Sequence, residues 1–299
     1  MTNRRQFLAA AASAPFLTSA PLTHGIIDAH THFYDPSRPQ GVPWPPKTEP
    51  ILYKTTLPDR FRKIVAPLGV TGTVVIEASA LFEDNQWVLD LAKDNPIIVG
   101  FVGHLEPGKP EFKDHLARFH RNPMFLGIRL GERPLGQGVQ DAPFIADMKR
   151  MADANLELDV IGSPAVFAHT VRLTNQVPNL RIVIDHLPFD SQNNDAFREL
   201  GQRPNVYAKV SGVLRQSGAS VPTALAFYRK SLDELWTNFG VDRLVYASNW
   251  PVSDKLAPYK NVVEVVQTYF AAKGPEAAEK FFWKNSKAAY RWVDGRAKA

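Results

Sequence analysis

Short runs of β-branched and other apolar residues alternate with amphipathic stretches along most of the chain, and this alternation repeats eight times. Apolar runs bounded by turn residues predict strands, and apolar positions spaced three and four apart predict helices. Strands and helices that alternate in this way are typical of a parallel sheet. The eight predicted strands cover Gly25–His32, Thr73–Glu77, Ile97–Gly103, Phe125–Arg129, Glu157–Val160, Arg181–Ile184, Val206–Val210 and Leu244–Ala247.

The helices predicted between these strands set the size of the repeating unit. Without its first twenty residues the chain keeps 279 of its 299 residues, about 35 per unit, which suits a (β/α)8 TIM barrel better than a six-stranded doubly wound sheet. No glycine-rich nucleotide-binding motif follows any strand. Two extra C-terminal helices, Asn261–Lys273 and Glu276–Trp292, are expected to pack outside the barrel. The other predicted helices include Asp59–Leu68, Asn85–Asp94, Pro110–His120, Phe144–Ala154, Ala165–Thr174 and Thr223–Asn238.

The segment Phe33–Pro58, between the first strand and its helix, shows no apolar periodicity. It contains seven of the 24 prolines together with Trp44. A long connection without secondary structure is usually functional or disordered, and prolines stiffen it. Because the loops that follow barrel strands lie on the catalytic face, this loop is expected to form a wall or partial lid over a pocket. The alternative is a surface loop without a role in the site.

The first residues have the pattern of a targeting segment. Arg4 and Arg5, followed by Gln-Phe-Leu and a short alanine-rich stretch, resemble the twin-arginine export signal of bacteria. We therefore expect residues 1–22 to be a signal peptide, 23–299 to be one barrel domain, and the twin-arginine machinery to deliver the protein to the periplasm. A cytosolic tail is the alternative. No later run of 18 residues is wholly apolar, so stable membrane insertion is not expected.

Composition narrows the kinds of chemistry that the chain can carry out. The sequence has no cysteine, which excludes disulfides, a thiol nucleophile and cysteine-ligated zinc. The net charge is +5, but lysines and arginines alternate with acids, and no run of basic residues is longer than a pair such as Arg4-Arg5. This distribution argues against nucleic acid and favours a small-molecule substrate. Any metal must be held by His, Asp, Glu or Asn.

Histidines stand at the ends of two predicted strands on opposite sides of the barrel. Asp28, His30 and His32 alternate in the first strand, so a period of two places all three on one face, the barrel interior. His186 follows the sixth strand and is expected to meet His30 and His32 across the barrel mouth. The three imidazoles are candidate ligands of one metal ion. The alternative is that they are hydrogen-bonded core residues.

Charged residues also occur at strand ends. Arg129 ends the fourth strand and Lys209 lies in the seventh, where either cation can bind a substrate carboxylate or stabilise an oxyanion. The alternative is a structural ion pair with Glu77 or Asp159. His104, at the end of the third strand, is a candidate for substrate contact or for a structural role.

Aromatic side chains accompany these polar groups. Tyr34 and Trp44 belong to the long first loop, and Trp250 follows the eighth strand. Their flat apolar rings are of the kind that sugar rings stack against. We therefore expect all three to contact the substrate.

Taken in order, these motifs resemble the amidohydrolase superfamily, and within it the amidohydrolase-related branch that includes sugar-lactone hydrolases and pyrone-dicarboxylate lactonase. The resemblance covers about residues 25–293. It implies a barrel in which the HxH of strand one, the His of strand six and an Asp of strand eight surround a scissile carbonyl. It also implies one divalent metal, zinc or manganese, in some members and metal-free operation in others. The motifs are Asp28–His32, Gly127–Arg129, Ile184–Leu187, Tyr207–Gly212 and Ser248–Val252.

One position departs from that pattern. Where the branch has Ser-Asp-Trp-Pro after strand eight, this chain has Asn249. An amide cannot act as a general base near neutral pH, so Asn249 can only orient water, coordinate weakly or bind substrate. The remaining candidates for the base are a metal-bound water and the side chains His186, Asp159, Glu77 and Asp254. Strand five carries Asp159 where two-metal members have His, so a binuclear site is not expected.

Three functions remain open on these observations. The leading one is hydrolysis of a lactone or related carboxylic ester, of the sugar-acid type, with Arg129 or Lys209 stabilising the oxyanion. Water would be activated by one metal ion held by His30, His32 and His186, or by a histidine alone. The second is non-oxidative decarboxylation of a carboxylic acid on the same fold. The third is ligand binding without catalysis, because of Asn249.

Overall fold

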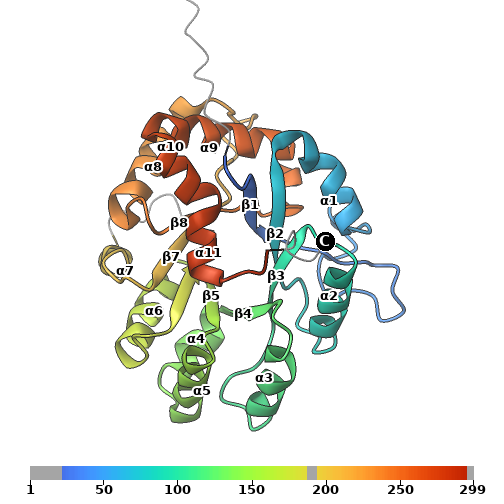
Figure 1. Ribbon diagram of the computed structural model, residues 1–299, viewed down its shortest axis with the longest axis vertical. Helices are drawn as coiled ribbons and strands as arrows, with labels where there is room; N and C mark the ends of the chain where they lie inside the picture. Colours follow the sequence, from blue (N-terminus) through green and yellow to red (C-terminus); the bar gives the residue numbers. More distant parts are fainter. Residues whose placement is uncertain (1–21, 187–193, 295–299) are drawn as a thin grey trace, which may run out of the picture.

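The computed structural model describes residues 22–186 and 194–294 (Figure 1). The predicted signal segment, apart from Leu22, and the Leu187 of the strand-six motif therefore lie outside the described residues. Among the described residues, no helix has both the length and the apolar character needed to cross a membrane.

Eight parallel strands form one sheet in the order β1 to β8, which confirms the predicted barrel. The ends of β8 and β1 meet: the amide of Asn249 donates to the carbonyl of His30 at 3.0 Å, and the amide of His32 donates to the carbonyl of Trp250 at 2.9 Å. These two bonds bring the segment after β8 against the histidines of β1. The strands are β1 (Ile26–Thr31), β2 (Val70–Ile76), β3 (Ile98–Gly103), β4 (Phe125–Gly131), β5 (Glu157–Ile161), β6 (Arg181–Ile184), β7 (Val206–Val210) and β8 (Leu244–Tyr246).

Helices surround the ring of strands (Figure 1). Two of them, α4 and α7, are absent from the predicted set. The α4 segment contains two glycines and a proline, and α7 has only six residues, so neither has a clear helical pattern. The α-helices are α1 (Pro58–Val65), α2 (Asp84–Lys93), α3 (Phe112–His120), α4 (Glu132–Gly138), α5 (Ala142–Asp153), α6 (Ala165–Gln176), α7 (Asp195–Leu200), α8 (Leu225–Phe239), α9 (Tyr259–Lys273), α10 (Pro275–Glu279) and α11 (Asn285–Tyr290).

The register of β1 is irregular, and this corrects the prediction that Asp28 shares a face with the two histidines. Asp28 pairs with Thr73 of β2, but the next pair joins Thr31 to Val75, so β1 gains one residue there. Asp28 consequently faces the outer helices, where the Tyr259 hydroxyl of α9 donates to Oδ2 at 2.9 Å. The extra residue reverses the alternation and turns His30 into the barrel.

Asp28 connects β1 to the segment that follows β8, at the carboxyl end of the barrel. Its carboxylate accepts hydrogen bonds from the backbone amide of Ser248 at 2.9 Å and from the Ser248 hydroxyl at 2.5 Å. Burial raises the pKa of Asp28 to about 6, against the opposing effect of these hydrogen bonds. Asp28 therefore positions Asn249 and His30 through the backbone.

The C-terminal segment fills the amino-terminal end of the barrel, which corrects the expectation that both last helices pack outside. Tyr290 and Trp292 join the inner cluster of apolar residues that includes Ile27 and Val99, while α9 lies in the outer layer against α8 and α1. The amide of Val293 donates to the carbonyl of Val99 at 2.9 Å. Figure 1 shows α11 near the centre of the ring of strands, in agreement with its contacts to β6 and β8.

We expect Trp292→Ala to lower the free energy of unfolding by about 3–5 kcal/mol, because it leaves a cavity under the inner cluster. The matched control is Phe227→Ala, since Phe227 is 39% exposed and its loss should cost less than about 1 kcal/mol. Urea unfolding of both variants measures the difference. Equal costs would contradict the placement of the C-terminal segment inside the barrel.

Candidate active site

Three imidazoles meet at the carboxyl end of the barrel. The Nε2 atoms of His30 and His32 lie 3.1 Å apart, and the ring centroids of His30 and His186 lie 4.4 Å apart. His186 follows β6 with a positive φ of 45°, a backbone conformation that is uncommon for residues other than glycine. The structure therefore brings the three predicted ligands together.

Each imidazole has a further partner on its other nitrogen. His32 Nδ1 lies 3.0 Å from the carbonyl oxygen of Ile76, and His186 Nδ1 lies 2.7 Å from the Ser211 hydroxyl. His30 Nδ1 has two neighbours, Lys209 Nζ at 3.1 Å and Asp185 Oδ1 at 3.4 Å. Such partners orient the rings, as they commonly do for histidines that bind metals.

Lys209 and Asp159 are paired beneath the histidines, inside the barrel. Lys209 Nζ lies 2.5 Å from Asp159 and 2.7 Å from Asp185, and all three side chains have no exposed surface. Burial alone lowers the pKa of Lys209, but the two carboxylates outweigh it and raise that pKa above its ordinary value. The Tyr290 hydroxyl donates to the other oxygen of Asp159 at 2.8 Å. The contacts of Lys209 and Asp159 are those of the structural ion pair considered above, and both side chains are fully buried.

Glu77 and Arg129 are paired at the rim. Arg129 Nε donates to Glu77 Oε1 at 2.9 Å, and a second guanidinium nitrogen donates to the Glu77 carbonyl at 2.8 Å. Both side chains are 14% exposed. Together with His104 they line a cavity of about 730 Å³ at the ends of β3, β4 and β5. Arg129 also lies 3.8 Å from Asp185, which links this cavity to the histidines.

The aromatic residues fall into two environments. Trp44, in the long first loop, is partly exposed and its ring lies 5.5 Å from that of His32, edge-on, as a wall beside the site. Tyr34 packs on Trp44, and its hydroxyl donates to the Leu52 carbonyl at 2.8 Å. Trp250 is fully buried against Phe61, so its ring presents no surface on which a sugar could stack.

Asn249 stands beside His30 in a left-handed backbone conformation, with φ of 60°. Asparagine tolerates this conformation better than most residues. Its side-chain oxygen is buried and accepts no hydrogen bond from the described residues. An unpaired buried acceptor costs about 1–3 kcal/mol, so this atom is suited to accept a hydrogen bond from water or substrate.

Burial keeps the imidazoles neutral. It lowers the pKa of His32 to about 3 and that of His186 to about 4, and it lowers the pKa of His30 well below its ordinary value. Nearby cations act in the same direction: Arg129 on His32 and Lys209 on His30. Neutral imidazoles are the form that binds metals or accepts protons.

The cluster has the donor set of a divalent metal site. His30, Asp185 and His186 each offer a ligand atom, and these atoms lie within 4.8 Å of one another. Imidazole and carboxylate donors suit zinc and also manganese. No pattern in the sequence indicates a role for Asp185 or Ser211. Only its position directly before His186, at the same strand end, singles out Asp185.

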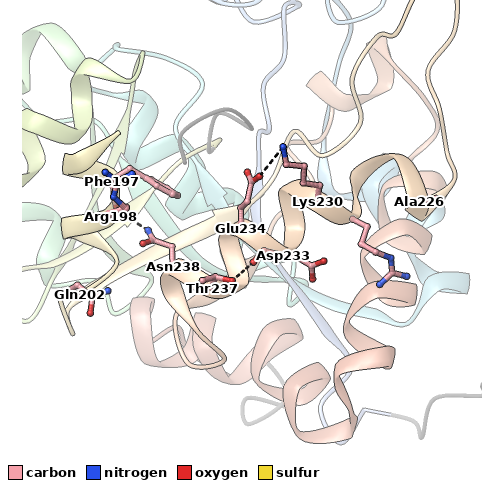
Figure 2. Close-up of a pocket in the computed structure, with 10 residues that line it drawn as sticks. Phe197, Arg198, Gln202, Ala226, Lys230, Asp233, Glu234, Thr237 and Asn238 are labelled. Carbon is pink, nitrogen blue, oxygen red and sulfur yellow. Dashed lines mark hydrogen bonds and ion pairs between the residues drawn. The ribbon is translucent and has the colours of Figure 1, made fainter. Parts of the chain in front are cut away.

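A second groove, of about 790 Å³, lies outside the barrel between α7 and α8 (Figure 2). Figure 2 shows Lys230 facing Glu234, 3.9 Å away, and Asn238 pointing toward the Phe197 segment. None of the candidate site residues lines this groove. Volume alone therefore does not locate the site, whereas the convergent histidines do.

A closed barrel of eight βα units with imidazoles and a carboxylate at the strand ends defines a barrel hydrolase site of the amidohydrolase type. Residues 27–292 match the amidohydrolase family. An L-fucono-1,5-lactonase of Burkholderia ambifaria is 31% identical over 243 residues, which is 76% of this chain and 80% of that protein. The chain belongs to the amidohydrolase family and is a hydrolase.

Other relatives agree with this assignment. A second L-fucono-1,5-lactonase, from Burkholderia multivorans, is 24% identical over 88% of this chain and 94% of its own length. A crystal structure of a Burkholderia multivorans amidohydrolase with bound zinc has a TM-score of 0.79 at 21% identity and covers 89% of this chain and 99% of that one. A 2-pyrone-4,6-dicarboxylic acid hydrolase from Pseudomonas putida, described as putative by its authors, has a TM-score of 0.70 at 21% identity, over 90% and 98%. The two solved structures share the fold.

The buried histidines predict a pH dependence of stability. His32 has a pKa of about 3 in the folded protein and about 6.5 in the unfolded chain, so below pH 6.5 only the unfolded state takes up its proton. As the pH falls from 6.5 toward 3, the wild type should lose about 1.4 kcal/mol per pH unit relative to His32→Gln.

Urea unfolding at a series of pH values, with a chelator present, measures this difference. The same substitution at the exposed His120 is the matched control. Parallel stability curves for the wild type and His32→Gln would contradict a buried neutral His32.

Proposed function

We propose that the protein hydrolyses a lactone of the sugar-acid type. The convergence of His30, His32 and His186 beside Asn249 carries this proposal, because it places proton-accepting nitrogens together at the carboxyl end of the barrel. The kinship with lactonases supports it. Lactone opening needs an activated water and a stabilised oxyanion, and the cluster supplies groups for both.

A divalent metal ion, zinc or manganese, would be held by His30 together with His32 and His186, with the carboxylate of Asp185 close by. When bound, such an ion polarises a carbonyl and lowers the pKa of water. The chain's own residues have separate tasks. Arg129 faces the cavity and can donate to the developing oxyanion, and the unpaired Oδ1 of Asn249 can orient the attacking water.

The proton acceptor in metal-free hydrolysis is assigned to His186. Its Nδ1 is committed to Ser211, so Nε2 is the nitrogen that accepts a proton when Nδ1–H donates to that hydroxyl. Asp159 is buried in its ion pair with Lys209, and Asp254 is paired with Arg60 at 3.1 Å. Glu77 is held by Arg129.

The charge of the cavity favours a neutral lactone over a dicarboxylate. Its lining includes the cations Arg129 and Lys109 and three acidic residues, Glu77, Glu106 and Asp141. The cations are therefore outnumbered, and no surplus positive charge is left for two carboxylates. Carboxylates and amides bind hydroxyl groups well, as a polyhydroxylated ring requires.

A panel of sugar-acid lactones tests the proposal. We expect ring opening by the wild type and a loss of about a hundred- to ten-thousand-fold in kcat/KM for His186→Ala, since the proton acceptor is removed. Phe227→Ala is the control and should keep full activity, because Phe227 does not line the cavity beside the histidines. Equal rates for the wild type and His186→Ala would overturn the assignment, and carbon dioxide release from a carboxylic-acid panel without ring opening would favour decarboxylation.

Asn249→Asp distinguishes an adapted enzyme from a binding protein. If the enzyme is adapted to Asn249, the substitution replaces the side-chain N–H donor by a charged oxygen beside neutral histidines. We therefore expect kcat/KM to fall at least about tenfold. The measurement is the same lactone assay. An inactive wild type that gains turnover from this substitution would instead indicate a protein that binds its ligand without catalysis.

We also propose export to the periplasm, on the basis of Arg4 and Arg5 followed by Gln-Phe-Leu. Replacing both arginines by lysine keeps the charge and removes the pair that the export machinery reads. We expect the full-length protein in the periplasmic fraction and the double-lysine variant in the cytoplasm. Equal distribution of the two proteins would contradict the proposal.

A further inference from the structure

The side chain of Lys209 begins a chain of hydrogen bonds that runs through His30 of β1 and through His32, which follows that strand. Lys209 Nζ lies 3.1 Å from His30 Nδ1, and His30 Nε2 lies 3.1 Å from His32 Nε2. His32 Nδ1 then lies 3.0 Å from the carbonyl oxygen of Ile76. All four residues are buried, so no bulk water competes for these contacts.

The two ends of this chain fix its direction. An ammonium group has only donors, and a carbonyl oxygen only accepts. His32 therefore donates from Nδ1 to Ile76 and accepts at Nε2. His30 accepts from Lys209 at Nδ1 and donates from Nε2 to His32. Each of the three contacts then holds one proton.

A second arrangement of the same residues has the opposite tautomer of His30. Asp185 Oδ1 lies 3.4 Å from His30 Nδ1 and makes no hydrogen bond with the described residues, so it is the acceptor that a proton on Nδ1 would face. The lone pairs of both Nε2 atoms would then face each other at 3.1 Å, where a cation is needed between them. This is the form that binds a metal, because ligating nitrogens must be unprotonated.

We propose that Lys209 is a positioning residue that selects the tautomer of His30 and thereby opposes metal binding by the histidine pair. In the first arrangement its ammonium donates to His30, whereas in the second it faces an N–H group at 3.1 Å. Metal uptake requires His30 to release a proton from Nε2 and to take one up at Nδ1, next to Asp185. The number of protons on His30 is the same before and after this exchange.

The wild type provides the first test. With ¹⁵N-labelled histidine in chelator-treated protein, two-bond proton–nitrogen correlations report which nitrogen of His30 is protonated, and His30→Gln assigns the signals. We expect Nε2–H without metal and Nδ1–H after one equivalent of Zn²⁺. Nδ1–H in the metal-free wild type would overturn the proposal.

Matched variants separate positioning from a merely structural role. Lys209→Met combined with Asp159→Asn removes one charge of each sign, and Asp159→Asn alone is the control. We expect the control to keep Nε2–H. The double variant should change to Nδ1–H and bind Zn²⁺ about tenfold more tightly, since a charged hydrogen bond to the competing tautomer is lost. An unchanged tautomer in a folded double variant would also overturn the proposal.

These measurements use no substrate. Failure of the lactone assay therefore leaves the tautomer result intact, and an unexpected tautomer leaves the lactone assay intact.

Discussion

The ammonium group of Lys209 joins the buried polar residues beneath the three histidines. Its nitrogen is hydrogen-bonded to Asp159 at 2.5 Å and to His30 at 3.1 Å, and it forms an ion pair with Asp185 at 2.7 Å. These partners come from β5, the end of β6 and β1, so one side chain of β7 joins four parts of the barrel. A buried charge without partners would cost several kcal/mol, and these three contacts offset this cost. The position of His186 follows, because it is the next residue after Asp185.

The rim depends on a second constraint, the junction of β8 with β1. Asp28 binds both the amide and the hydroxyl of Ser248, and the next residue, Asn249, donates its amide to His30. The irregular register of β1 makes this possible, since it turns Asp28 outward and His30 inward. The side-chain amide of Asn249 thus stands beside the imidazoles with an unpaired oxygen, so a hydrogen-bond acceptor is available there.

Sequence patterns predicted the barrel and the meeting of His30, His32 and His186, because strand order places the carboxyl ends of all strands at one rim. They did not predict the turn of Asp28 toward α9, because a bulge depends on pairing with β2 and leaves the local alternation unchanged. Nor did they place Tyr290 inside the barrel, since its partner Asp159 lies 131 residues away. The charge of Lys209 and the aromatic ring of Trp250 suggested that both contact the substrate, but both side chains are buried. Their burial depends on the packing of segments distant in the sequence, which the local pattern does not reveal.

A crystal structure with an open-chain sugar acid, the product of lactone opening, shows whether the substrate binds next to the histidine cluster. We expect the acid in the cavity beside Glu77 and Arg129, with its carboxylate within hydrogen-bond distance of Arg129 and facing His186. Binding only in the groove between α7 and α8, with the histidine cluster left uncontacted, would contradict this expectation.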